Sequence, residues 1–330
     1  MIRINYIDNM KAAGIILVVL GHAAWLNESI YILIYSFHMP LFFFMSGYLA
    51  SRQHPIKKAL IKLNHRLIIP FGFFFFVSFC LWLPLHFFGG GQASNMPWFD
   101  PLFRLITAQA DSFHINGVLW FFPCLIVISV LQIVIFSKMK LITAFITSAV
   151  ILSFLLVNVG LIKTRFYWCL DSAVVGLFFF QMGRVIKESD LLNSTVLSQK
   201  YFIWILLLIL LPIFYIAALK NGRVDMRELS FGVIPFLYPL ISCLGIFILF
   251  LICSLLKTSS TSRLLALSSI AIFPLHLIIF RFLNKFQLMI LDSTSVMFSV
   301  LPYFNSLLAI VICIFVFNFL KKRAPSAIGV

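Results

Sequence analysis

Long apolar runs separated by short polar segments set the pattern of this chain. A membrane-spanning helix needs about 20 predominantly apolar residues. The runs predict about ten such helices, at 12–28, 30–50, 67–88, 117–136, 141–160, 167–186, 201–219, 231–256, 264–283 and 296–319. The runs lack the alternation of apolar and polar positions that a transmembrane β-barrel requires. We therefore predict an all-α membrane protein in which residues 1–330 form a single polytopic transmembrane domain.

Basic residues are distributed unevenly between the two sets of connecting segments. If the N-terminus is cytoplasmic, the inner segments include Lys11, Lys57, Lys58, Lys62, Arg66, Lys138, Lys140, Arg184, Lys187, Lys321, Lys322 and Arg323. Acidic residues lean toward the opposite side, for example Glu28, Asp171, Asp225 and Glu228. Cytoplasmic segments of membrane proteins carry an excess of Lys and Arg. The charges thus predict that both termini are cytoplasmic.

Composition agrees with the membrane assignment and changes how the net charge is interpreted. Hydrophobic residues make up 62% of the chain and charged residues only 11%, against about 25% charged in soluble domains. The net charge is +15, but its sidedness indicates membrane topology rather than nucleic-acid binding. Two explanations of the basic inner face remain open at this stage, topology alone and a site for a polyanionic cytoplasmic ligand. The six cysteines contain no C-x-x-C pair, so we expect neither a disulfide framework nor a zinc site.

Three histidines and one aspartate fall inside the predicted spans. His22, His38 and His276 lie at similar depths, and Asp171 lies toward the outer end of its span. Ionisable groups within a span are costly and often functional. A single histidine is satisfied easily by a neighbouring helix, but several at one depth favour a shared polar centre. No H-x-x-x-H spacing accompanies them, so we expect no metal site.

Lys11 lies directly before the first predicted span, at its basic inner end. It precedes His22 by eleven positions, or about 16 Å along a helix. This spacing fits a ligand that extends from the basic inner face to a deeper reaction centre. The alternative is a lysine that extends its ammonium group to the membrane interface.

At these residues the sequence resembles the membrane acyltransferase-3 family. The resemblance is carried by Asp8, Lys11 and His22, by the stretch 36–49 that begins Ser36-Phe37-His38-Met39-Pro40, by Arg66 and Pro70, by Leu119-Trp120-Phe121 and by Phe273-Pro274-Leu275-His276. The stretch 36–49 is most similar to the fucose 4-O-acetylase-like branch. Lys11 stands where the family often has arginine, and Leu63 stands where it often has a further arginine.

The resemblance implies an integral-membrane O-acyltransferase of the bacterial plasma (inner) membrane. The donor would be cytoplasmic acetyl-CoA, and the acceptor a hydroxyl of a sugar in an extracytoplasmic or lipid-linked glycan. Implied partners are therefore acetyl-CoA, the glycan and membrane lipid, with no nucleic acid and no metal. The implied roles are catalysis by His22 as general base with His38 and Asp171, donor binding by Asp8, Lys11 and Arg66, and substrate binding by Tyr48, Trp120 and His276. Ser46 and Tyr48 are the expected donors to the oxyanion.

Two other classes of function fit parts of the same pattern. A transporter or flippase for a glycan-related substrate also has many spans and intramembrane histidines, but it leaves the spacing between Lys11 and His22 unexplained. A catalytically silent scaffold or sensor is the third class, and the presence of Asp8, Lys11 and His22 speaks against it.

Overall fold

The computed structural model describes residues 5–50, 55–88, 96–189, 199–290 and 296–329. Over these residues the protein is almost entirely helical, with a single two-stranded hairpin. Nine helical segments within them are long and apolar enough to cross a membrane, namely Glu28–Tyr48, Ile56–Phe88, Gly117–Lys138, Leu141–Leu161, Tyr167–Glu188, Lys200–Asn221, Leu237–Leu255, Ser260–Ile290 and Leu301–Arg323. The predicted all-α membrane bundle is confirmed.

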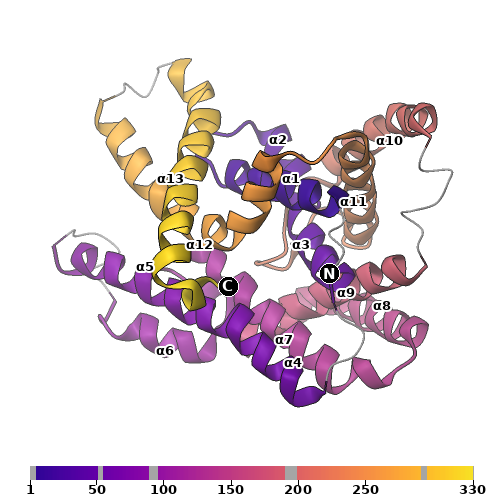
Figure 1. Cartoon of the computed structure of the whole chain (residues 1–330), viewed down its shortest axis with the longest axis horizontal. Helices are drawn as coiled ribbons and strands as arrows, with labels where there is room; N and C mark the ends of the chain where they lie inside the picture. The colour runs from indigo at the N-terminus through magenta and orange to yellow at the C-terminus, as the bar shows by residue number, and fades with distance from the viewer. Residues whose placement is uncertain (1–4, 51–54, 89–95, 190–198, 291–295, 330) are drawn as a thin grey trace.

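The described elements are mainly helices, joined by connections of different length. The helices are α1 (Asn5–Gly21), α2 (Glu28–Tyr35), α3 (His38–Tyr48), α4 (Ile56–Leu63), α5 (Ile69–Phe88), α6 (Asp100–Thr107), α7 (Phe121–Val134), α8 (Leu141–Asn158), α9 (Leu170–Glu188), α10 (Lys200–Asn221), α11 (Leu237–Leu255), α12 (Ser260–Ile290) and α13 (Leu301–Arg323). Strands β1 (Val224–Asp225) and β2 (Ser230–Phe231) pair antiparallel between α10 and α11. Figure 1 shows α8 beside α9, α10 beside α11 and α12 beside α13. Helix α1 packs on α12, and α3 packs along α9.

Helix α1 occupies a different range from the predicted span 12–28. Within the described residues it covers Asn5–Gly21, and an early polar residue of this helix finds partners inside the protein. The amide nitrogen of buried Asn9 donates to the carbonyl of Leu256 (3.0 Å) and, at 3.3 Å, to that of Cys253. Its 17 described residues extend about 26 Å, and its last residue is Gly21. His22 therefore lies just beyond the end of α1 rather than inside a helix.

The predicted span 30–50 is a broken helix. Helix α2 ends at Tyr35 and α3 begins at His38. The carbonyl of Ser36 at the break accepts a hydrogen bond from the Ser242 hydroxyl of α11 (2.6 Å). A backbone group freed inside a membrane protein needs such a partner. The break places His38 at the first position of α3.

Three further boundaries differ from the predicted ones. The span expected at 67–88 starts at Ile56, because a π-helical turn at Asn64–Ile68 joins α4 to α5 without interruption. Helix α11 begins at Leu237 rather than at 231, since the hairpin and Pro235 precede it. Helix α12 is longer than the predicted 264–283 and continues through Pro274.

Candidate functional site

Three histidines from different elements meet in the interior. The ring centroid of His22 lies 5.1 Å from that of His276 and 6.3 Å from that of His38. His38 and His276 are almost completely buried, with 2% and 0% of their surface exposed. His22 follows α1, His38 opens α3 and His276 lies within α12. The structure thus brings together the three histidines that the sequence placed at similar depths.

The three rings share one hydrogen-bond pattern. Each Nδ1 bonds to the carbonyl four residues earlier, at 2.8 Å for His22, 2.9 Å for His38 and 3.0 Å for His276. A carbonyl oxygen only accepts hydrogen bonds, so each Nδ1 carries the hydrogen. In a neutral imidazole, Nε2 then keeps its lone pair. Nε2 of His276 is buried and has no hydrogen-bond partner within the described part of the chain.

His22 and His38 line a cavity of about 120 Å³, which we call the histidine cavity. Tyr35 lies between them, with its ring centroid 5.8 Å from that of His22 and 4.7 Å from that of His38. The other polar or aromatic residues of its lining are Trp120, Asp225, Arg227 and Phe273. The cavity therefore places an imidazole base beside groups that can hold a polar ligand.

A second cavity of about 300 Å³, the basic cavity, lies toward the start of α1. Its lining includes Lys11, Ser46, Arg66, Phe121, Phe122 and Phe273. An adjoining cavity of about 300 Å³ shares Ser46 and Arg66 with it and adds Lys62 and Gln132. Arg66 belongs to the π-helical turn, a feature that often occurs at functional sites. Lys11 and Arg66, far apart in sequence, thus face one space suited to a polyanion.

Phe273 lines both the basic cavity and the histidine cavity. Its ring packs 5.1 Å from that of Phe121 and 6.4 Å from that of His276, measured between centroids. The following residue, Pro274, is held by Asn116, whose side-chain amide donates to its carbonyl at 2.7 Å. Phe273 is therefore a fixed aromatic partition between the two cavities.

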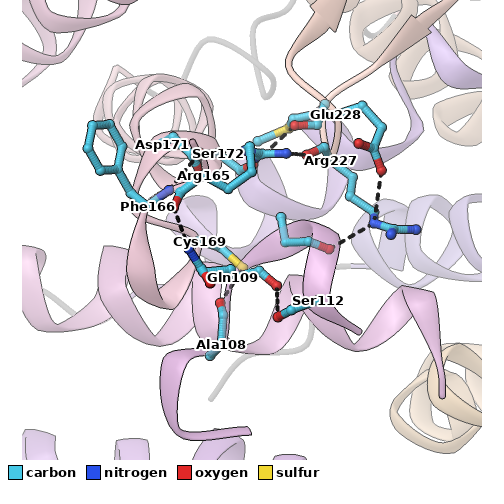
Figure 2. Close-up of polar contacts among 12 residues, drawn as sticks. Ala108, Gln109, Ser112, Arg165, Phe166, Cys169, Asp171, Ser172, Arg227 and Glu228 are labelled. Atoms are coloured by element: carbon cyan, nitrogen blue, oxygen red, sulfur yellow. Dashed lines mark hydrogen bonds and ion pairs between the residues drawn. The ribbon is translucent and has the colours of Figure 1, made fainter. Parts of the chain in front are cut away.

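Asp171 lies in a different network, at the N-terminus of α9 (Figure 2). Its carboxylate accepts hydrogen bonds from Nε of Arg165 (2.6 Å), from the backbone N–H of Phe166 (3.2 Å) and from that of Ser172 (2.8 Å). Burial acts to lower the pKa of Arg165, but the hydrogen bond and charge of Asp171 outweigh it and raise that pKa. Within the described residues, no hydrogen bond joins Asp171 to a histidine of the cluster.

The network around Asp171 holds the hairpin that contributes Asp225 and Arg227 to the lining of the histidine cavity. Arg165 donates to the backbone carbonyl of Arg227, and the Ser172 hydroxyl donates to that of Met226 at 3.1 Å. Asp171 thus acts on the histidine cavity indirectly, by positioning this hairpin.

Asp225 and Arg227 are the site residues that sequence reasoning did not identify. Oδ1 of Asp225 accepts the backbone N–H groups of Arg227 (2.8 Å) and Glu228 (3.3 Å). Burial raises the pKa of the Asp225 carboxyl, while those N–H groups and the charge of Arg227 oppose the rise. Nε of Arg227 donates to the carbonyl of Ala110 at 2.9 Å and lies 3.3 Å from Oε1 of Glu228. In the sequence, the feature that could have indicated them is a pair of opposite charges two positions apart, in a short polar segment between apolar runs.

The remaining predicted residues do not share one environment. Trp120 lines the histidine cavity and is 5% exposed. Tyr48 is buried outside the cavities, and its hydroxyl lies 2.6 Å from that of Tyr6. The Ser46 hydroxyl donates to the carbonyl of Phe42 at 2.7 Å, and Asp8 lies on α1 one turn before Lys11. Among the described residues, no group of three or more His, Cys, Asp or Glu side chains is arranged to hold a metal ion.

Comparison with known proteins identifies one family. A family model described as an acyltransferase domain matches residues 4–320, nearly the whole chain. No curated protein and no solved structure matched.

Proposed function

Because the chain belongs to the acyltransferase family defined by this domain, we propose that it moves an acetyl group from cytoplasmic acetyl-CoA to a sugar hydroxyl. The acceptor is an extracytoplasmic or lipid-linked glycan, and the protein is a fucose 4-O-acetylase-like enzyme of a bacterial plasma (inner) membrane. Both termini then face the cytoplasm, with the basic cavity on the donor side and the histidine cavity on the acceptor side.

The meeting of the two cavities at Phe273 carries this proposal. Acetyl-CoA is a large polyanion with its reactive thioester at the end of a long arm, whereas a sugar hydroxyl needs a base. A cavity with Lys11 and Arg66 suits the phosphates of the donor, and one with His22 suits the hydroxyl. Their common wall is where an acyl group passes from one substrate to the other.

His22 performs the proton transfer in the proposed reaction. Its Nε2 accepts the proton of the acceptor hydroxyl as the oxygen bonds to the carbonyl carbon of the thioester. The carbon–sulfur bond then breaks, and the leaving CoA thiolate takes the proton back from Nε2. The hydrogen bond from Nδ1 to the carbonyl of Val18 holds the ring in the required tautomer. His38 and His276 flank the ring and orient it toward the acceptor.

A direct test uses the purified full-length protein in lipid vesicles with radiolabelled acetyl-CoA and methyl hexopyranosides as acceptors. We expect free CoA thiol and acetylated glycoside to form in equal amounts. A transporter or flippase would instead move the glycoside across the vesicle membrane with no release of thiol. That outcome would contradict the proposed activity.

Removing the positively charged side chains of the basic cavity is expected to weaken the binding of acetyl-CoA. Lys11→Ala and Arg66→Ala should each raise KM for acetyl-CoA about tenfold, because a hydrogen bond to a charged group is worth roughly 1.5–3 kcal/mol. The turnover at saturating donor should change much less, since neither side chain lines the histidine cavity. Lys322→Ala, at the exposed end of α13, is the matched control. An unchanged KM in both cavity variants would exclude this donor site.

Replacing Phe273 by a smaller residue is expected to change which acyl groups are transferred. Phe273→Ala should raise the rate with butyryl-CoA relative to acetyl-CoA at least about tenfold, since one methylene in an apolar pocket is worth about 10–200-fold in discrimination. Phe122→Ala is the control, because Phe122 lines the basic cavity but not the histidine cavity. The ratio of initial rates with the two donors is the measurement. An equal shift in both variants would show that Phe273 has no special role as a partition.

A further inference from the structure

The hairpin between α10 and α11 carries two polar groups of opposite charge into the histidine cavity. Asp225 and Arg227 both line this cavity together with His22. They reach it from a segment about 200 residues away in the chain, so their presence there is a property of the fold. The proposed donor cavity contains neither residue.

Asp225 and Arg227 each keep hydrogen-bonding atoms that a ligand can use. Oδ1 of Asp225 is occupied by two backbone N–H groups, whereas Oδ2 has no hydrogen-bond partner within the described chain. Nε of Arg227 is occupied by Ala110 and Glu228, whereas its two Nη groups have no partner within the same residues. One carboxylate oxygen thus remains as an acceptor and two amino groups remain as donors.

Two hydrogen bonds hold the hairpin in place, and a glycine leaves room beside the guanidinium. Arg165 and Ser172 bind the backbone carbonyls of Arg227 and Met226, as Figure 2 shows for the labelled residues. Gly117 leaves room for the guanidinium, since a Cβ at this position would lie 2.9 Å from Nη1 of Arg227. A group fixed in this way binds a ligand with little further loss of side-chain entropy.

The hairpin lies at the opposite end of the bundle from the start of α1. Asn9 of α1 binds the C-terminal end of α11 through the carbonyls of Cys253 and Leu256. The hairpin precedes the N-terminal end of α11, a full helix length away. Asp225 and Arg227 therefore stand on the side from which the acceptor, not the donor, enters in the proposed reaction.

We propose that Asp225 and Arg227 form the acceptor subsite, which holds a hydroxyl neighbouring the reacting one on a neutral sugar. This inference rests on the proposed function and adds the recognition chemistry. A sugar hydroxyl both donates and accepts, so it donates to Oδ2 of Asp225 and accepts from an Nη group of Arg227. The opposite charges balance, which favours an uncharged sugar over a uronic acid. The aromatic rings of Tyr35 and Trp120 line the cavity and suit the C–H face of a pyranose.

The size of the cavity indicates how much of the acceptor enters it. At about 120 Å³ it is smaller than the roughly 300–1,000 Å³ of pockets that enclose a whole small ligand. Only the reacting end of a glycan fits, and the rest remains outside. A terminal or otherwise accessible sugar unit is the expected substrate.

The test measures acetyl transfer from radiolabelled acetyl-CoA to methyl hexopyranosides by the full-length protein in lipid vesicles. We expect Asp225→Asn and Arg227→Gln to raise KM for the glycoside about tenfold or more, with KM for acetyl-CoA unchanged. Asparagine keeps an oxygen for the two backbone N–H groups, so the hairpin is retained. Gly117→Ala should have a smaller effect of the same sign by displacing the guanidinium. Arg223→Gln is the matched control, because Arg223 is exposed and paired with Glu28 outside the cavity.

A substrate lacking one hydroxyl separates a binding role from a structural one. We expect the wild-type protein to prefer the parent glycoside about tenfold over the analogue deoxygenated beside the acetylated position. In Asp225→Asn and Arg227→Gln this preference should largely disappear, because the partner of that hydroxyl is gone. A preference that persists at its wild-type value would overturn the subsite while leaving the acyltransferase activity intact. Absence of transfer to every glycoside by the wild-type protein would instead contradict the proposed function itself.

Discussion

Replacing His22 by glutamine is expected to lower the turnover of acetyl transfer about a thousandfold. A positioned general base contributes about 10²–10⁴-fold to a rate, and His22 is the histidine that both lines the cavity and contacts the other two rings. Glutamine retains a hydrogen-bonding side chain but cannot accept the proton. The loss should therefore appear in kcat, measured with saturating acetyl-CoA and glycoside.

Donor binding provides the internal control for this experiment. Lys11 and Arg66 line a cavity that His22 does not line, so His22→Gln should bind acetyl-CoA as the wild-type protein does. His86→Gln, at the far end of α5, should leave kcat unchanged. A folded His22→Gln protein that retains kcat within about threefold of wild type, far from the 10²–10⁴-fold expected of a base, would exclude His22 as the general base.

Adding a methyl group at Gly183 or Gly47 is expected to destabilise the bundle severely. A Cβ at Gly47 would overlap the backbone carbonyl of Phe180 on α9, and a Cβ at Gly183 would overlap that of Phe44 on α3. Helices in membranes approach closely where small residues face each other. A backbone carbonyl, unlike a side chain, cannot move to another rotamer. Each alanine should therefore cost about 3 kcal/mol or more, at the upper end of overpacking effects.

Thermal unfolding in detergent measures this loss. A cost of about 3 kcal/mol corresponds to a decrease in Tm of roughly 4 °C or more for a chain of this size. Gly72→Ala is the matched control, because a Cβ at Gly72 on α5 meets no atom within 4 Å. That variant should gain slightly, since alanine is about 1 kcal/mol better than glycine in a helix. Equal Tm values for Gly183→Ala and Gly72→Ala would contradict the close contact of α3 and α9.

The close packing of α3 and α9 also bears on the function. Helix α3 begins with His38, and α9 begins at the network of Asp171 and Arg165. The two glycines thus fix the distance between a wall of the histidine cavity and the support of the hairpin. Partial loosening at this contact should lower activity even where the protein still inserts into the membrane.

The sequence by itself determined the class of fold and indicated the family from its motifs. Apolar runs of span length predict transmembrane helices wherever they occur, because the thickness of the bilayer sets the length. The motifs around Lys11, His22 and His276 indicated the acyltransferase family, and the family match over residues 4–320 agrees. The similar depths of His22, His38 and His276 also favoured their meeting, since contact requires residues to share one layer of the bundle, although a shared layer does not by itself bring them together.

Helix boundaries could be predicted less well, for a local reason. Hydropathy places the first span at 12–28, but α1 already includes the polar residue Asn9, whose amide finds partners at the C-terminal end of α11. The break between α2 and α3 depends likewise on Ser242 of α11. A polar residue is compatible with a buried helix only when another segment satisfies it, and hydropathy along the chain does not contain that information.

Only the tertiary structure decided which polar groups share a cavity. Asp171 has the depth expected of a catalytic partner, yet its hydrogen bonds go to Arg165, Phe166 and Ser172. Asp225 and Arg227 lie in a polar connection and nevertheless line the cavity of His22. Depth follows from position within one helix, which the sequence specifies. Contact across the bundle follows from how helices far apart in sequence pack and rotate against each other, and this chain sets that arrangement through close approaches such as the one between Gly47 and Gly183.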